Sequence, residues 1–196
     1  MENQININET INHPVVYGLN RSVVVSKYAM TTDTEACTDE ITQGVDVRGR
    51  CIAGTGHNNF LCGIIVQFDL TFTIKAWTEA ERYHWFDIVT SQSTMHRISK
   101  MDFDKTFIKY TDKRIVAILE ELKNKYLETK DKEDYLKLLY SCPTGLKLTA
   151  GITTNYLQLK TIYKQRHDHR LPEWRVFCDW LETLPHSGWI TAQVTI

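Results

Sequence analysis

Hydrophobic and polar residues alternate strictly over one stretch near the middle of the chain. Across 66–75 every second residue is apolar, and Gln, Asp, Thr or Lys fills each position between them. A period of two places successive side chains on opposite faces of a strand. The pattern therefore predicts a strand with one buried face, which includes Phe72, and one face rich in hydrogen-bonding groups.

Other stretches repeat their apolar residues every three or four positions, which is typical of amphipathic helices. This spacing predicts a long helix over about 112–129, a shorter one over about 132–140 and a last one over 172–184. Pro143 limits the second helix, and Pro172 lies in the first turn of the last one. Across 146–166 the Thr-rich beginning is ambiguous, and helical spacing is clear only beyond Asn155.

Local signals predict the remaining elements and complete the fold class. Clustered valines favour a strand within 15–28, and Thr78 with Glu81 forms a capping-box pattern that predicts a helix over 79–89. The mixed stretch 32–50 leaves room for a short helix. We expect an α+β fold, an antiparallel sheet packed with several helices. Because Pro (4) and Gly (9) mark no linker, we expect one domain over residues 1–196.

Composition narrows the class of protein. With 23 Lys+Arg against 24 Asp+Glu the net charge is -1, which argues against a nucleic-acid polymer as partner. No apolar run approaches the ~18 residues of a membrane-spanning helix, and the polar, Asn-rich first residues are unlike a signal peptide. The five cysteines include no CxxC pair, which favours reduced thiols. We therefore expect a cytoplasmic protein that does not associate with membranes.

One polar segment, 91–97, is a candidate anion site. It holds Ser91, Ser93, Thr94 and Arg97 within seven residues. The arginine fork can bind phosphate through two hydrogen bonds, and small hydroxyls add compact donors. The spacing does not distinguish such a site from a solvated loop.

Two further clusters combine polar groups. The Gly-rich turn at 56–59 contains His57 and Asn59, but it matches no phosphate-binding signature and is equally consistent with a surface turn. The segment 165–170 contains Arg166, two histidines and Arg170. Its arginines disfavour a bound metal, which leaves a nucleotide-binding cluster or a charged connection between helices.

The order of these clusters resembles the flavin-dependent thymidylate synthases. In that family a Gly-His turn precedes a strand, then a helix, a motif of the form RHRxxSxNxxSxRY, further helices, and a last Asn-containing helix with an Arg. Here Gly56-His57, the strand over 68–74, the polar segment 91–97, Asn155 and Arg166 follow in the same order. The resemblance covers about residues 15–180.

The resemblance implies an activity and a set of partners. It implies reductive methylation of dUMP to dTMP, or a related 5-substitution, with FAD, NADPH and methylenetetrahydrofolate and without a metal, in a homotetramer with active sites between subunits. By this resemblance a pyrimidine nucleotide would contact Ser91, Ser93, Arg97 and Arg166. For the cofactor, the candidates are His57, Asn59, Asn155 and Arg170.

The sequence differs from the family where RHR would hold the flavin. Phe86-Asp87-Ile88 occupies that place and contains no arginine. Two function classes therefore stay open beside a purely structural protein on the same fold. One is a divergent flavin enzyme with a rebuilt cofactor site. The other is a catalytically inactive protein that binds the nucleotide, to sense or sequester it.

Overall fold

The computed structural model describes residues 5–195, and its centre is a four-stranded antiparallel sheet with the strand order β1-β2-β4-β3. The predicted α+β class is confirmed. The strands are β1 (Ile11–Tyr17), β2 (Ile65–Thr73), β3 (Phe86–Ser91) and β4 (Lys147–Asn155).

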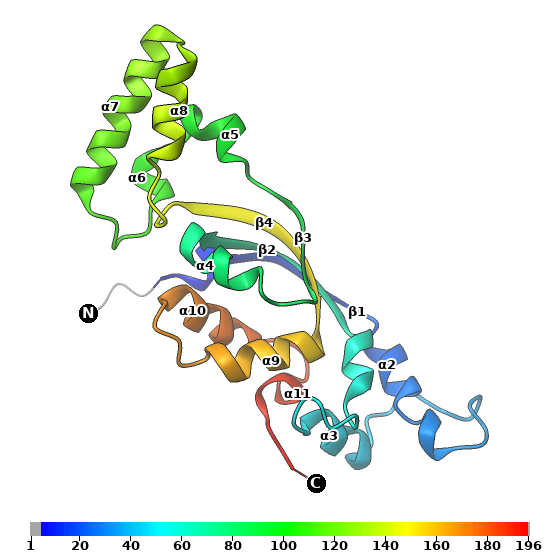
Figure 1. Cartoon of the computed structure of the whole chain (residues 1–196). Helices are drawn as coiled ribbons and strands as arrows, with labels where there is room; N and C mark the ends of the chain where they lie inside the picture. Colours follow the sequence, from blue (N-terminus) through cyan, green and yellow to red (C-terminus); the bar gives the residue numbers. More distant parts are fainter. Residues whose placement is uncertain (1–4, 196) are drawn as a thin grey trace.

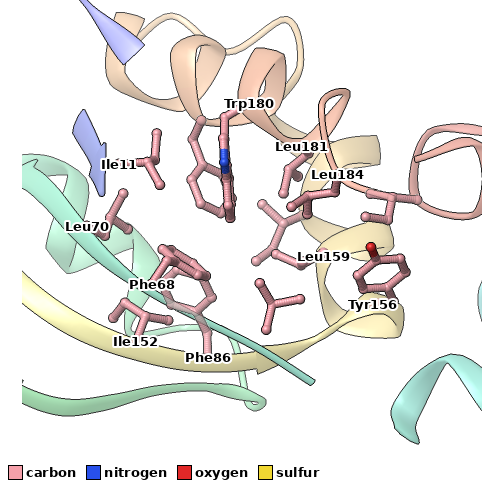
Figure 2. Packing of buried hydrophobic residues seen from close by; sticks show 14 of the residues in the cluster. Ile11, Phe68, Leu70, Phe86, Ile152, Tyr156, Leu159, Trp180, Leu181 and Leu184 are labelled. Atoms are coloured by element: carbon pink, nitrogen blue, oxygen red, sulfur yellow. The ribbon is translucent and has the colours of Figure 1, made fainter. Parts of the chain in front are cut away.

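One face of the sheet is covered by α9 (Tyr156–Arg166) and α10 (Pro172–Leu181), as Figure 1 shows. The alternating residues of β2 point into this layer, and Phe72 is fully buried, as its sequence pattern predicts. Figure 2 shows Trp180 of α10 directed at Phe68 of β2, with ring centroids 4.7 Å apart. Burial of these rings supplies much of the hydrophobic driving force for folding.

The helix predicted over 79–89 is wrong. The side chain of Thr73 accepts a hydrogen bond from the Ala76 amide at 3.2 Å, so α4 (Ile74–Ala80) begins directly where β2 ends. The chain then turns and forms β3. Thr78 lies inside α4, where its hydroxyl donates to the Lys75 carbonyl instead of capping a helix.

The strand predicted within 15–28 is correct only up to Tyr17. Gly18 adopts a positive φ of 74°, and a Cβ there would lie 2.4 Å from the Gly63 carbonyl oxygen. Only glycine fits this turn, and α2 follows it despite its valines. The short helices of this half are α1 (Ile7–Thr10), α2 (Leu19–Val25), α3 (Gln43–Arg50), η1 (Tyr28–Met30) and η2 (Asn59–Gly63).

A helical hairpin extends from one end of the sheet (Figure 1). Its helices, α7 (Lys113–Thr129) and α8 (Lys132–Tyr140), are close to the predicted ones and begin at the capping residues Asp112 and Asp131. They share a second hydrophobic cluster with the segments next to the sheet. Those segments include η3 (Ile98–Lys100) and α6 (Phe103–Thr106), and the short helix α5 (Thr94–Arg97) directly precedes η3.

The C-terminal end is held by a buried lysine. Lys160 of α9 has no exposed surface, and its ammonium donates to the carbonyls of Gly49, at 3.1 Å, and Trp189, at 2.8 Å. These carbonyls belong to α3 and to α11 (Gly188–Thr191). Burial lowers the pKa of Lys160 to about 8, and no carboxylate of the described residues forms an ion pair with its ammonium.

Candidate functional site

A polar pocket of about 650 Å³ opens where β3 ends and α5 begins. We call it the β3–α5 pocket. Of the predicted nucleotide-binding residues, Ser91, Ser93 and Arg97 all line it. The other lining residues are Gln92, His96, Lys100, Met101, Asp102 and Thr106.

The turn that carries these side chains is fixed by its neighbours. Gln92 exchanges two hydrogen bonds with the Thr149 backbone of β4, each of 2.9 Å. The Tyr135 hydroxyl of α8 donates to the Met95 carbonyl, which ties α5 to the helical hairpin. Ser93 Oγ lies 3.0 Å from His96 Nδ1. The pocket is therefore lined by a braced turn between two elements and not by a free loop.

The β3–α5 pocket has uncompensated positive charge. Neither Arg97 nor Lys100 forms an ion pair within residues 5–195, and both are exposed. The lining carboxylate, Asp102, is paired with Lys105 at 3.2 Å, and this contact lowers the pKa of Asp102. A guanidinium, an ammonium and two serine hydroxyls facing one cavity form a donor set that suits a phosphate. Sequence reasoning missed Lys100, although it follows Arg97 at a spacing of three.

Arg166 is not brought to this pocket. It lies at the C-terminal end of α9 and faces α4, where its Nη1 is 2.8 Å from Glu79 Oε2 and its Nε donates to the Tyr83 hydroxyl at 2.7 Å. Its guanidinium also stacks over the Trp174 ring, 4.9 Å from the centroid. A separate pocket of about 570 Å³, lined also by Arg82 and Tyr83, lies beside Arg166.

Titratable groups around Arg166 are coupled. Burial opposes ionisation of Glu79, but the hydrogen bond from Lys75 and the charges of His169, Lys75 and Arg166 outweigh it, so the pKa of Glu79 is lowered. The pKa of His169 is also lowered, by burial first and by Arg166, although Glu79 favours its protonated form. This cluster is satisfied internally, so Arg166 is held mainly by the protein's own carboxylate.

The structure does not bring all four predicted cofactor residues together in one chain, because Asn155 and Arg170 lie at opposite ends of α9. His57 lies in the turn before η2 and Asn59 is the first residue of η2, and both are exposed. Asn155 is buried and caps α9, with its Oδ1 accepting from the Gln158 amide at 2.9 Å. Arg170 is exposed beyond the other end of α9, which spans eleven residues or roughly 16 Å.

By the family resemblance, Phe86-Asp87-Ile88 occupies the place where RHR would bind the flavin. These residues do not fit a flavin. Phe86 points into the core, with its ring 6.0 Å from that of Phe177. Asp87 and Ile88 follow on the exposed part of β3, so a flavin pyrophosphate would meet a carboxylate and an alkyl side chain there. Phosphate groups need donors or cations at such a position.

Between residues 5 and 195, no three His, Cys, Asp or Glu side chains come together in a way that could hold a metal ion. His167 contacts Asp168 and the Tyr163 carbonyl, while His169 faces Glu79. None of the helices in this part of the chain is long and apolar enough to cross a bilayer.

Comparison with known proteins gives a match in structure and none in sequence. No protein-family model matches the chain, and no curated protein does. Among solved structures, the flavin-dependent thymidylate synthase ThyX from Helicobacter pylori, complexed with FAD and dUMP, superposes with a TM-score of 0.71 at 14% identity, covering 93% of this chain and 97% of that one. A second structure of ThyX from the same organism with FAD and dUMP gives 0.71 at 12% identity, with 93% and 96% covered. At this identity the likeness is one of fold.

Proposed function

We propose that the chain is a divergent protein on the thymidylate-synthase ThyX fold that binds a pyrimidine nucleoside monophosphate such as dUMP. The observation that carries the proposal is the β3–α5 pocket, in which Arg97 and Lys100 have no carboxylate partner among residues 5–195. The similar solved structures hold dUMP on the same fold. This proposal requires only a binding site for the nucleotide phosphate. The flavin reaction requires a cofactor site as well.

Each side chain has a distinct part in the proposed clamp. Arg97 offers the planar fork that suits two phosphate oxygens, and Lys100 adds a second positive charge. Ser91 and Ser93 supply hydroxyl donors at the turn. Pairing of Asp102 with Lys105 leaves the net charge of the pocket positive, which favours an anion.

Titration calorimetry with dUMP and with deoxyuridine tests the proposal. Because the donor set is directed at the phosphate, dUMP should bind and deoxyuridine should bind at least about tenfold more weakly, which is about 1.4 kcal/mol. The difference should shrink as salt is raised, since exposed charges are screened. Equal binding of the two ligands, or none of dUMP, would contradict the proposal.

The second candidate is an active flavin enzyme that uses FAD, NADPH and methylenetetrahydrofolate for 5-substitution of dUMP. The similar fold of proteins complexed with both FAD and dUMP favours it. In that alternative His57, Asn59, Asn155 and Arg170 remain the predicted donors to the cofactor. The absorbance spectrum from about 350 to 500 nm, taken after equilibration with FAD and desalting, separates the two. We expect a colourless protein, and retained flavin bands would favour the enzyme.

Assembly and location are part of the same proposal. We propose a homotetramer on the basis of the family resemblance, and light scattering of the purified protein would measure the mass. A single domain and a cytoplasmic location also stay predictions.

A further inference from the structure

A second pocket, of about 410 Å³, lies at the end of the sheet beside the first turn of α10, and we call it the α10 pocket. It shares no lining residue with the β3–α5 pocket. β1 begins to pair with β2 at Ile11 and Leu70, so Thr71 and Thr73 continue past it. Both threonines line the α10 pocket.

A carboxylate oxygen in this pocket lacks a partner. Glu173 of α10 is only 5% exposed. Its Oε1 accepts a hydrogen bond from the Thr73 hydroxyl at 2.7 Å, but its Oε2 is buried without a hydrogen-bond partner in the described part of the chain. Buried polar atoms nearly always have a hydrogen-bond partner, and a buried polar atom without one costs free energy of folding. Because Glu173 lines the α10 pocket, a ligand bound in this pocket is the source from which the missing donor would come.

A lysine of the same pocket is also unpaired. Lys147 of β4 pairs with Thr73 in the strand register, so its side chain starts beside the hydroxyl that contacts Glu173. Within residues 5–195 it forms no ion pair, either with Glu173 or with another carboxylate. Among the lining residues, the buried Glu173 thus lacks a donor for one oxygen and Lys147 lacks a carboxylate, and the two are not paired with each other. Glu9, Asp104, Lys109 and Lys105, which is paired with Asp102, also line the pocket.

The chemistry of the lining selects among ligand classes. A metal ion would need several converging acidic or imidazole ligands, which do not come together within the described residues. A simple anion would be repelled by the carboxylates of Glu173, Glu9 and Asp104, and a simple cation would leave Lys147 unmatched. Phe107 and Ile108 give the pocket an apolar wall that suits methylene groups.

We propose that the α10 pocket binds a small zwitterion of the amino-acid class, with its ammonium on Glu173 and its carboxylate on Lys147. The site is separate from the proposed nucleotide pocket and does not depend on it. In this arrangement the ligand supplies the donor that Glu173 Oε2 lacks and the anion that Lys147 lacks. One ligand molecule thereby pairs with both Glu173 and Lys147.

A series of unbranched ω-amino acids tests the proposal and measures the span between the two groups. The probes are glycine, 3-aminopropanoate, 4-aminobutanoate, 5-aminopentanoate and 6-aminohexanoate, titrated into the full chain by calorimetry or ligand-observed NMR. One chain length should bind best, with a dissociation constant of about 1 mM or below. This corresponds to a binding free energy of about 4 kcal/mol or more. Butylamine and butanoate, which each carry one of the two charges, should bind at least about tenfold more weakly, because a charged hydrogen bond is lost.

Two variants locate the site. Glu173→Gln keeps an oxygen that can accept from Thr73 but loses the charge, and it should weaken the best probe about tenfold or more. Lys147→Met removes the partner of the ligand carboxylate and should also weaken the best probe about tenfold or more. If Glu173→Gln does not fold, Lys147→Met alone tests the proposal. Lys132→Met, on the exposed hairpin, is the matched control and should bind like wild type. No saturable binding of any probe, or equal binding after the Lys147→Met change, would overturn the proposal.

Discussion

Arg166 and Glu79 form an ion pair that is almost closed to solvent, with Nη1 and Oε2 2.8 Å apart although 87 residues separate them in the sequence. The two side chains keep 12% and 17% of their surface exposed. Because Arg166 ends α9 and Glu79 lies in α4, the pair fixes one helix against the other. Trp174 of α10 donates to the same Glu79 oxygen at 3.2 Å, so three helices meet at one carboxylate.

Replacement of Arg166 should therefore affect stability more than nucleotide binding. Arg166→Ala removes the guanidinium from a largely buried Glu79, which keeps Lys75 and Trp174 as partners, and we expect the free energy of unfolding to fall by about 2–4 kcal/mol. Urea denaturation measures this change, and Arg82→Ala, on an exposed side chain nearby, is the control. A variant with wild-type stability but weakened dUMP binding would place Arg166 in the nucleotide site instead.

The same cluster should make the protein less stable in acid. The pKa of His169 is lowered from its usual 6.5, so as the pH falls below that value the unfolded chain takes up a proton that the folded chain resists. The pKa of Glu79 is lowered from 4.5, so its contribution is complete above that value and is lost as the pH falls through the folded pKa. Both effects have the same sign. Urea midpoints between pH 8 and 4 should fall less steeply in His169→Gln than in wild type, and parallel curves would contradict this account.

Lys160 should make the free energy of unfolding depend on pH in the alkaline range. Its pKa is about 8 in the folded chain and 10.5 ordinarily, so between these values the unfolded chain binds more protons. Stability contributed by this residue should therefore rise with pH across that window, by up to about 3 kcal/mol.

The difference between wild type and Lys160→Met isolates this contribution, because buried thiols such as Cys178, whose pKa burial raises to about 12, titrate identically in both. The methionine leaves the carbonyls of Gly49 and Trp189 unpaired, so the variant should not be more stable than wild type at pH 10. Chemical denaturation at several pH values gives the difference. A constant difference from pH 7.5 to 10.5 would show that Lys160 does not titrate there.

Phe72 tests the core. Its ring is fully buried and contacts the rings of Trp77, Trp174 and Phe177 with centroids 4.8 to 6.0 Å away. Phe72→Ala should cost about 3–5 kcal/mol through lost burial and a residual cavity. Thr71→Ala on the opposite face is the matched control and should cost far less. A melting temperature near that of wild type would contradict the packing of this strand.

Periodicity predicted the long elements because burial decides them. The alternation in β2 and the helical spacing in α7 and α8 both reflect one buried face, and each pattern extends over enough residues to be distinctive. The boundary at Thr73 was hidden, because Ile74 continues the alternation although the Thr73 side chain already caps α4. The valines of α2 favour a strand by local propensity, but Gly18 turns the chain before them and a helix forms instead. Tertiary structure thus overrides the local propensity here.

The candidate site was predictable only where its residues are close in sequence. Ser91, Ser93 and Arg97 lie within seven residues, so a single turn carries them into one pocket. Arg166 was assigned to the same site from a family resemblance, but its partner Glu79 is far away in the sequence and no local pattern indicates their pairing. Glu173 gave no signal either, because what marks it is burial of one oxygen beside a cavity.

The measurement that tests the central claim most directly is a calorimetric titration of dUMP into wild type, Arg97→Ala and Arg82→Ala. Both arginines are exposed and lie in different pockets, Arg97 in the β3–α5 pocket and Arg82 beside Arg166. The account predicts that Arg97→Ala weakens binding by about 1.5–3 kcal/mol, which is the loss of a charged hydrogen bond, and that Arg82→Ala binds like wild type. Undiminished binding by Arg97→Ala would contradict the assignment of the nucleotide phosphate to the β3–α5 pocket.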